Sequence, residues 1–178
     1  VKPLYKIKYK DIVRIPPVSI DLKSHSVSRL LTNDLKKIIL YENEDFMVID
    51  KPAGIAVHSG SKIKSDIMTS LKSMDKYRSL SLVHRLDLNT SGCLILAKHY
   101  QAASGLGKLF QRGDIQKNYL SLLAGSLKAD KLAIDQSLQR SRDNHKNSVS
   151  VSKYGKEAFS YISLISQFKE CCLVDIEI

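Results

Sequence analysis

Hydrophobic and polar residues alternate along much of this chain with the two-residue period of β-strands. Apolar runs at 38–41 and 46–49 flank the acidic turn 42–45, which is typical of a β-hairpin. Further strands are predicted over 80–83, 93–97, 115–124, 158–165 and 171–178. Alternation, unlike a continuous apolar run, is typical of antiparallel sheets with one solvated face. We therefore expect an α+β fold built on a mainly antiparallel, mixed sheet.

Helical spacing occurs in two segments. Residues 65–74 place Ile67 and Leu71 one turn apart, which predicts a short amphipathic helix. Residues 100–110 have the same pattern, although two glycines weaken it by about 1 kcal/mol each relative to alanine. Strands are therefore expected to outnumber helices.

Three regions of different composition suggest the domain organisation. Residues 1–20 contain two short alternating strands, which cannot form a core of their own, so we expect the end of a further domain. Residues 21–35 are polar and rich in serine, and we interpret them as a linker. Residues 36–178 contain the strands and helices above and form the main domain.

The chain is strongly basic. Its net charge of +10 comes from 28 basic and 18 acidic residues, and segments 1–20 and 139–156 each contribute +4. Such a surface attracts polyanions, so nucleic acid, and RNA above all, is the expected partner. The hydrophobic fraction of 43% is that of a packed globular protein.

The cysteines, the histidines and the length of the apolar runs argue against a disulfide-rich, a metal-binding or a membrane-spanning protein. Cys93, Cys171 and Cys172 form neither a disulfide framework nor a zinc motif, and Cys93 is expected to be buried in its apolar strand. The histidines lack the spacing of metal ligands. No apolar run reaches the roughly 18 residues of a membrane span. We expect a cytoplasmic monomer without a metal site.

Residues 83–98 contain the strongest candidate for chemistry. Asp87 stands between two apolar runs, with His84 and Arg85 just before it and Thr-Ser-Gly after it. A carboxylate beside a cation stays ionised and can act as nucleophile or base. Strand geometry would place Arg85 and Asp87 on the same side. The structural alternative is a turn aspartate that bonds its own backbone, with Arg85 in a weak surface ion pair.

Two other segments allow a structural and a functional interpretation. Tyr119 lies on a predicted strand, where half-buried packing is the usual role, but a tyrosine can also stack on an RNA base. Lys51-Pro52-Ala53-Gly54 is either a plain turn or the rigid rim of an RNA cleft.

These segments together resemble the RluA-type RNA pseudouridine synthases, most closely the RluC-like branch that acts on large-subunit ribosomal RNA. Residues 84–92 carry the H-R-L-D-x-x-T-S-G signature, 117–125 are similar to K-x-Y-x-x-x-x-x-G, and 41–54 resemble the opening hairpin of that catalytic domain. Residues 1–17 resemble the tail of an S4 RNA-binding domain, with Lys10 where the family usually has glycine.

The resemblance implies a role for each residue. Asp87 is the catalytic aspartate, Tyr119 stacks on a flipped-out uracil, and Arg85 helps to hold the extruded nucleotide. His84 is grouped with the substrate-binding residues as support, since a histidine beside a reactive acid more often orients a neighbour than reacts itself. The resemblance also implies large-subunit ribosomal RNA as partner, and no cofactor or metal. A third family motif, similar to G-R-T-H-Q-I-R, is not found. We therefore expect a fragment with weak or no activity and an unpaired strand edge.

One other function remains as an alternative, and a third is rejected. A non-catalytic RNA-binding or ribosome-assembly module would explain the charge, but not why Arg85 and Asp87 share a turn. A glycoside hydrolase usually needs two carboxylates that flank the bond, and the nearest acids, Asp75 and Asp114, show no supporting pattern.

Overall fold

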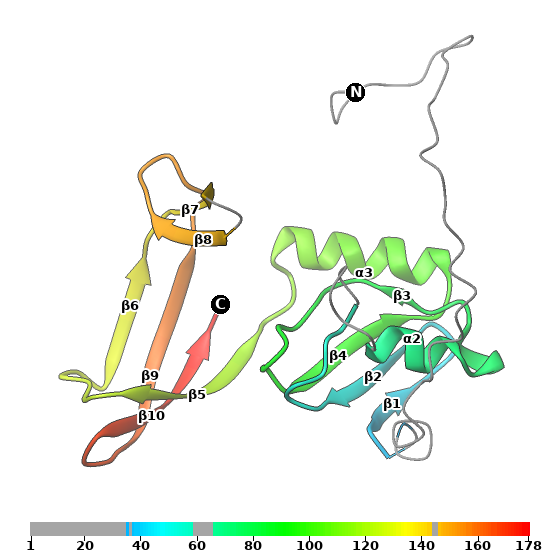
Figure 1. Ribbon diagram of the computed structural model, residues 1–178, viewed down its shortest axis with the longest axis horizontal. Coiled ribbons are helices and arrows are strands. Elements are labelled where there is room, and N and C mark those ends of the chain that lie inside the picture. The colour runs from blue at the N-terminus through cyan, green and yellow to red at the C-terminus, as the bar shows by residue number, and fades with distance from the viewer. Residues whose placement is uncertain (1–34, 36, 59–65, 144–145) are drawn as a thin grey trace, which may run out of the picture. The chain divides into compact units, whose positions relative to one another are not determined.

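The computed structural model describes residues 35, 37–58, 66–143 and 146–178. The chain divides into two compact units, one ending at His99 and the other spanning Tyr100–Ile178 (Figure 1). The segment 1–20 and the linker up to residue 34 lie outside the described residues, so both remain predictions. Leu35, the last residue of the predicted linker, is buried.

The first unit is built on a four-stranded antiparallel sheet in the order β1-β2-β4-β3. Its strands are β1 (Ile39–Glu42), β2 (Phe46–Lys51), β3 (Ser81–Leu82) and β4 (Gly92–Ala97). The β1–β2 turn is closed by Asn43, whose Oδ1 accepts the N–H groups of Asp45 and Phe46. Alternate residues of the central strands β2 and β4 are buried: Met47, Ile49, Lys51, Leu94 and Leu96.

A short helix and a 3₁₀ turn connect β2 to β3. Helix α2 (Ile67–Lys72) buries Ile67, Met68 and Leu71, and η1 (Asp75–Tyr77) buries Tyr77. The fully buried Asp66 caps α2, because its carboxylate accepts the Thr69 N–H at 2.7 Å and the Thr69 hydroxyl at 2.9 Å. The segment after β2 is tied to this helix, since the Ile67 N–H donates to the Ala56 carbonyl at 3.0 Å.

Glu42, at the end of β1, joins three elements of the first unit. Its carboxylate contacts Lys98 Nζ at 3.0 Å and Lys76 Nζ at 3.0 Å, and it accepts the Tyr77 hydroxyl at 3.0 Å. Partial burial raises the pKa of Glu42, but the hydrogen bonds from Lys98, Lys76 and Tyr77 outweigh it and hold the pKa below its ordinary value of 4.5. The ionised carboxylate therefore stabilises the fold.

We expect Glu42→Gln to lower the free energy of unfolding near neutral pH by about 1–3 kcal/mol, the range for hydrogen bonds to a charged group. A carboxyl whose pKa is depressed in the folded state stabilises it above the unfolded pKa and ceases to do so as the pH falls through the folded pKa. Urea unfolding should thus show a difference at neutral pH that disappears well below pH 4.5. Glu44→Gln, two residues along at an exposed position, should show neither effect.

Within the described residues 100–143 and 146–178, the second unit contains one long helix and six strands. Helix α3 (Tyr100–Arg112) precedes β5 (Asn118–Ala124), β6 (Lys131–Asp135), β7 (Leu138–Asp143), β8 (Lys146–Val151), β9 (Phe159–Gln167) and β10 (Cys171–Glu177). Four of the strands form an antiparallel sheet in the order β5-β10-β9-β6, whose outer strands are β5 and β6. Strands β7 and β8 form a separate antiparallel hairpin.

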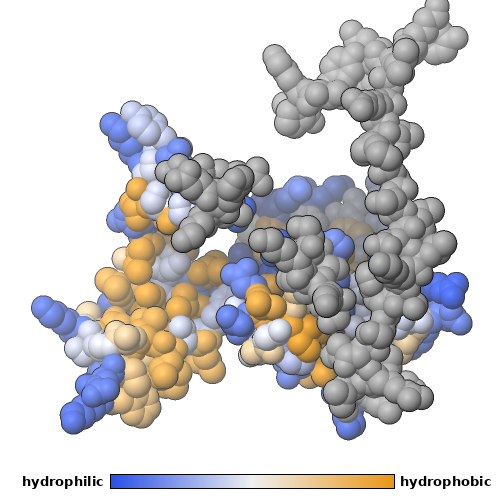
Figure 2. Space-filling view, in the orientation of Figure 1, coloured by the Kyte–Doolittle hydropathy of each residue, from blue (hydrophilic) through white to orange (hydrophobic). Residues whose placement is uncertain are grey.

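The two faces of the four-stranded sheet differ in burial. One carries a small core of Ile162, Cys172 and Val174, against which partly buried side chains such as Leu123 and Ile176 pack. Leu120 and Leu122 alternate with the core-facing residues of β5 and are exposed, so hydrophobic side chains appear at the surface of this sheet (Figure 2). The second unit therefore buries a small core.

The prediction of a mainly antiparallel α+β fold is confirmed, because every strand pair among the described residues is antiparallel. Strands β6, β7 and β8 were not predicted, since β6 is exposed along its whole length and 138–151 is largely polar. The prediction that Cys93 is buried is wrong. Cys93 pairs with the exposed Asp50 of β2, and both side chains lie on the solvent-exposed face of the sheet. The next residue, Leu94, lies on the buried face. None of the described helices is long and apolar enough to cross a membrane.

Candidate active site

The segment between β3 and β4, residues 83–91, carries Asp87 and is called the Asp87 loop below. Strand β3 ends at Leu82, so the predicted strand geometry at His84–Asp87 is wrong. Side-chain exposure still alternates, however. Arg85 and Asp87 are exposed, and Leu86 between them is buried. The loop thus presents a cation and a carboxylate to solvent while Leu86 anchors it.

As a purely structural residue, Asp87 would bond its own backbone through its side chain or form an ion pair with Arg85. Asp87 does lie in a turn, but the bond that closes the turn uses its backbone carbonyl, which accepts the Thr90 N–H at 3.1 Å. Among the described residues, its carboxylate makes no hydrogen bond or ion pair, and neither does the Arg85 guanidinium. The surface ion pair between Arg85 and Asp87 is therefore not formed. Both side chains have their charged groups available for a ligand.

Lys51 lies beneath this loop and is fully buried. Its ammonium donates to the carbonyls of Pro52 at 2.9 Å, Ile55 at 2.9 Å and Leu88 at 3.3 Å. The Leu88 carbonyl also accepts the Gly54 N–H at 2.8 Å. Lys51 therefore ties the loop at 52–55 to the residue that directly follows Asp87, which limits how far the carboxylate can move.

Burial and charge act in opposite directions on Lys51. Burial lowers the pKa of its ammonium, and the nearby Asp87 carboxylate partly offsets this by raising it. A buried cation thus stands close to the candidate catalytic acid. The prediction of a turn or a cleft rim at 51–54 missed this role. The signal was the two-residue period that places Lys51 on the buried face with Met47 and Ile49.

His84 contacts the sheet as well. Its Nε2 accepts the backbone N–H of Ile95, on β4, at 2.8 Å. An imidazole nitrogen that accepts a hydrogen bond carries no proton, so Nδ1 holds the proton of the neutral ring. His84, Leu86 and Leu88 thus attach the Asp87 loop to the first unit at three points.

Tyr119 belongs to the second unit, on β5 opposite Ile176 of β10. It is half-buried at the end of the face that holds the small core. Its hydroxyl makes no hydrogen bond to any described residue. The structure thus brings His84, Arg85 and Asp87 together on one loop and holds Tyr119 on a separate, regular strand.

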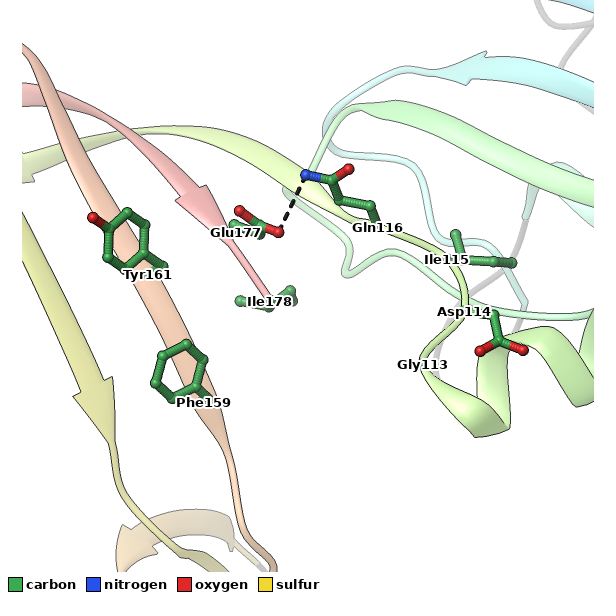
Figure 3. A pocket seen from close by; sticks show the side chains of 8 residues that line it. All are labelled: Gly113, Asp114, Ile115, Gln116, Phe159, Tyr161, Glu177 and Ile178. Carbon is green, nitrogen blue, oxygen red and sulfur yellow. Dashed lines mark hydrogen bonds between the residues drawn. The ribbon is translucent and has the colours of Figure 1, made fainter.

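A pocket of about 580 Å³ lies entirely within the second unit (Figure 3). It is lined by Gly113, Asp114, Ile115, Gln116, Phe159, Tyr161, Glu177 and Ile178. Gln116 Nε2 donates to Glu177 Oε1 at 3.1 Å across one wall. Its two ionisable acids and lack of a lysine or arginine give it the wrong charge for an RNA phosphate, and none of the four predicted site residues lines it. The described residues also contain no cluster of three metal-ligating side chains.

Comparisons with known proteins agree with this fold and loop. Residues 45–178 match the family described as RNA pseudouridylate synthase. Solved structures of two human proteins, RNA pseudouridylate synthase domain containing 4 and domain containing 1, superpose with TM-scores of 0.67 and 0.66. They share 23% and 19% sequence identity with the chain and cover 83% and 78% of it, and the matched parts are 61% and 58% of those proteins. At this identity the likeness defines the fold.

Curated relatives extend the likeness to the sequence. The chain is 36% identical to ribosomal large subunit pseudouridine synthase C of Pasteurella multocida and 35% identical to that of Buchnera aphidicola subsp. Schizaphis graminum. These matches cover 98% and 99% of the chain but only 55% and 57% of the relatives, so it spans about half their length. The chain belongs to the RNA pseudouridylate synthase family.

Proposed function

We propose that this chain is part of a pseudouridine synthase that isomerises specific uridines in large-subunit ribosomal RNA, with Asp87 as the catalytic residue. The observation that carries the proposal is the state of Asp87 in a chain of this family. Its carboxylate is exposed, makes no hydrogen bond to a described residue, and stands on a loop tied to the fold on both sides. A side chain that served only the turn would bond its own backbone.

The reaction changes which base atom is joined to the ribose. The N1–C1′ bond breaks, the uracil turns, and a C5–C1′ bond forms, after which C5 gives up its proton and N1 gains one. Asp87 starts this sequence either by attacking the sugar or base, or by removing a ribose proton, and both routes need an ionised carboxylate. The buried Lys51 ammonium lies close enough to Asp87 for the two opposite charges to attract each other.

The other predicted residues have binding roles in this proposal. Arg85 is exposed next to Asp87 and holds the extruded nucleotide, while Tyr119 stacks on its base. Uridine must leave its helix or loop, which costs a few kcal/mol and favours unpaired sites. The charge of +10 provides general attraction to RNA. We further propose that 1–20 belong to an S4-type RNA-binding domain, that 21–35 are a linker, and that the protein works as a cytoplasmic monomer.

Removal of the gene provides the direct test of the substrate. Pseudouridines in large-subunit RNA are mapped in cells with and without the gene, and in cells that express the Asp87→Asn variant. The proposal predicts that specific positions lose pseudouridine in the deletion and are not restored by the variant. If the variant restores ribosome assembly and no pseudouridine depends on the gene, the protein is a non-catalytic RNA-binding module.

Tyr119 offers a second prediction. A stacked ring contributes about 1–3 kcal/mol per base, so Tyr119→Ala should lower kcat/KM for RNA by about tenfold or more. Tyr119→Phe keeps the ring and should remain within about threefold of wild type if stacking is its main role. A Phe variant as impaired as the Ala variant would instead assign the function to the hydroxyl.

A further inference from the structure

The ladder between β3 and β4 ends after two residue pairs, and His84 follows two positions after its last residue on β3. Only two residue pairs, Ser81 with Ala97 and Leu82 with Leu96, join the strands. The next residue of β4 is Ile95. Its N–H needs an acceptor from the segment that follows β3, which no longer pairs with β4. That partner is the Nε2 atom of His84, at 2.8 Å. A side-chain acceptor thus takes the place of a third pair of the ladder.

This contact controls the first half of the Asp87 loop. Downstream of Asp87, the Leu88 carbonyl is held by Lys51 and by the Gly54 N–H. Upstream, the nearest polar tie to the sheet recorded for the described residues is the bond from Ile95 to His84, three positions before Asp87. Leu86 adds an apolar anchor between them. The catalytic side chain therefore stands between two fixed points, one made by Lys51 and the other by His84.

We infer that His84 is a positioning residue for Asp87 and Arg85, acting through its bond to the Ile95 amide rather than by contact with RNA. The inference rests on the proposed function for its kinetic consequences, although the bond itself can be tested without RNA. It makes specific the orienting role expected for a histidine at this position, and it replaces the grouping of His84 with the substrate-binding residues. The half-buried ring, with Nε2 directed at the backbone of β4, agrees with this assignment.

Three substitutions distinguish a role of His84 as hydrogen-bond acceptor from a role that depends only on the size of its side chain. In His84→Gln, the side-chain carbonyl can reach the place of Nε2 and accept the Ile95 N–H. His84→Leu keeps apolar bulk where the Nδ1 and Cδ2 atoms of the ring lie, without an acceptor. His84→Asn has a carbonyl that corresponds to Nδ1 and stops short of the amide.

The bond is measured first, in the complete protein without RNA. Hydrogen exchange should show that the Ile95 amide is protected in wild type and in His84→Gln, and that it exchanges at least about tenfold faster in His84→Leu and His84→Asn. Nitrogen NMR of wild type should show Nε2 as the unprotonated nitrogen of a neutral ring. Equal protection of Ile95 in wild type and His84→Leu would overturn the inference, whether or not the protein is a synthase.

Kinetics then test the consequence for the loop. A displacement of the acid of about 1 Å can slow a reaction by about a hundredfold, so His84→Leu should lower kcat by about tenfold to a hundredfold. The KM for RNA should change by less than about threefold, and His84→Gln should restore most of kcat. A rise in KM in all three variants without rescue by glutamine would mean that His84 contacts the substrate, which would contradict the inference.

Discussion

Replacement of Asp87 by Asn is expected to lower the rate of pseudouridine formation by about 10³-fold or more, because an amide is neither a base nor a nucleophile of comparable strength. The carboxylate makes no hydrogen bond to a described residue, so its loss should leave folding unchanged within about 0.5 kcal/mol. RNA affinity should stay within about threefold of wild type or rise slightly, since a negative charge near a polyanion is removed. Single-turnover assays and RNA titration measure the two effects separately.

Asp50→Asn is the matched control for this substitution. Asp50 is also an exposed aspartate of the first unit, and it lies next to Lys51 on the opposite face of β2. Its variant changes the same charge and should retain the wild-type rate. Equal loss of rate in the two variants would show that net charge, and not the position of Asp87, causes the effect.

Replacement of Lys51 by Met is expected to reduce both stability and activity. The substitution removes the donor to the carbonyls of Pro52, Ile55 and Leu88. Removal of the buried charge is favourable by itself. The Leu88 carbonyl keeps the Gly54 N–H, but the Pro52 and Ile55 carbonyls lose the Lys51 donor at a cost of about 1–3 kcal/mol, and we expect that loss to dominate. The Leu88 anchor is weakened and the cation beside Asp87 is lost, so kcat should fall by about a hundredfold.

Urea unfolding and single-turnover rates of Lys51→Met give these two quantities. Lys72→Met, the same substitution at an exposed position near the end of α2, is the control and should change neither by a measurable amount. Stability and activity of Lys51→Met equal to those of the control would show that the loop at 52–55 and the Asp87 loop hold their places without the ammonium.

The sequence predicts most strands of the fold because burial follows a two-residue period in them. It does so well for β2 and β4, whose alternate residues are buried. It fails for β6–β8, whose backbones pair although residues 131–135, 138–141 and 148–151 are all exposed. These strands therefore lack a buried face that the two-residue period could reveal. For Cys93 the apolar run predicted burial where there is none, because β4 has one exposed face and Cys93 lies on it.

The candidate site is predictable where chemistry and sequence proximity coincide. His84, Arg85 and Asp87 are neighbours in a motif, and the fold presents them on one loop. The tie between Lys51 and Leu88 joins residues 37 positions apart, and the bond from Ile95 to His84 depends on where β3 ends. Neither contact can be derived from local pattern, because each depends on the register of strands that pair across the sheet.

Release of the hydrogen at C5 of uridine tests most directly whether Asp87 catalyses this isomerisation. Large-subunit RNA labelled with tritium at C5 is incubated with the complete protein and with its Asp87→Asn variant. The proposal predicts that wild type releases tritium to water in step with pseudouridine formed, and that the variant releases none above background over the same time. No release by the complete wild-type protein, or release by the variant at the wild-type rate, would contradict it.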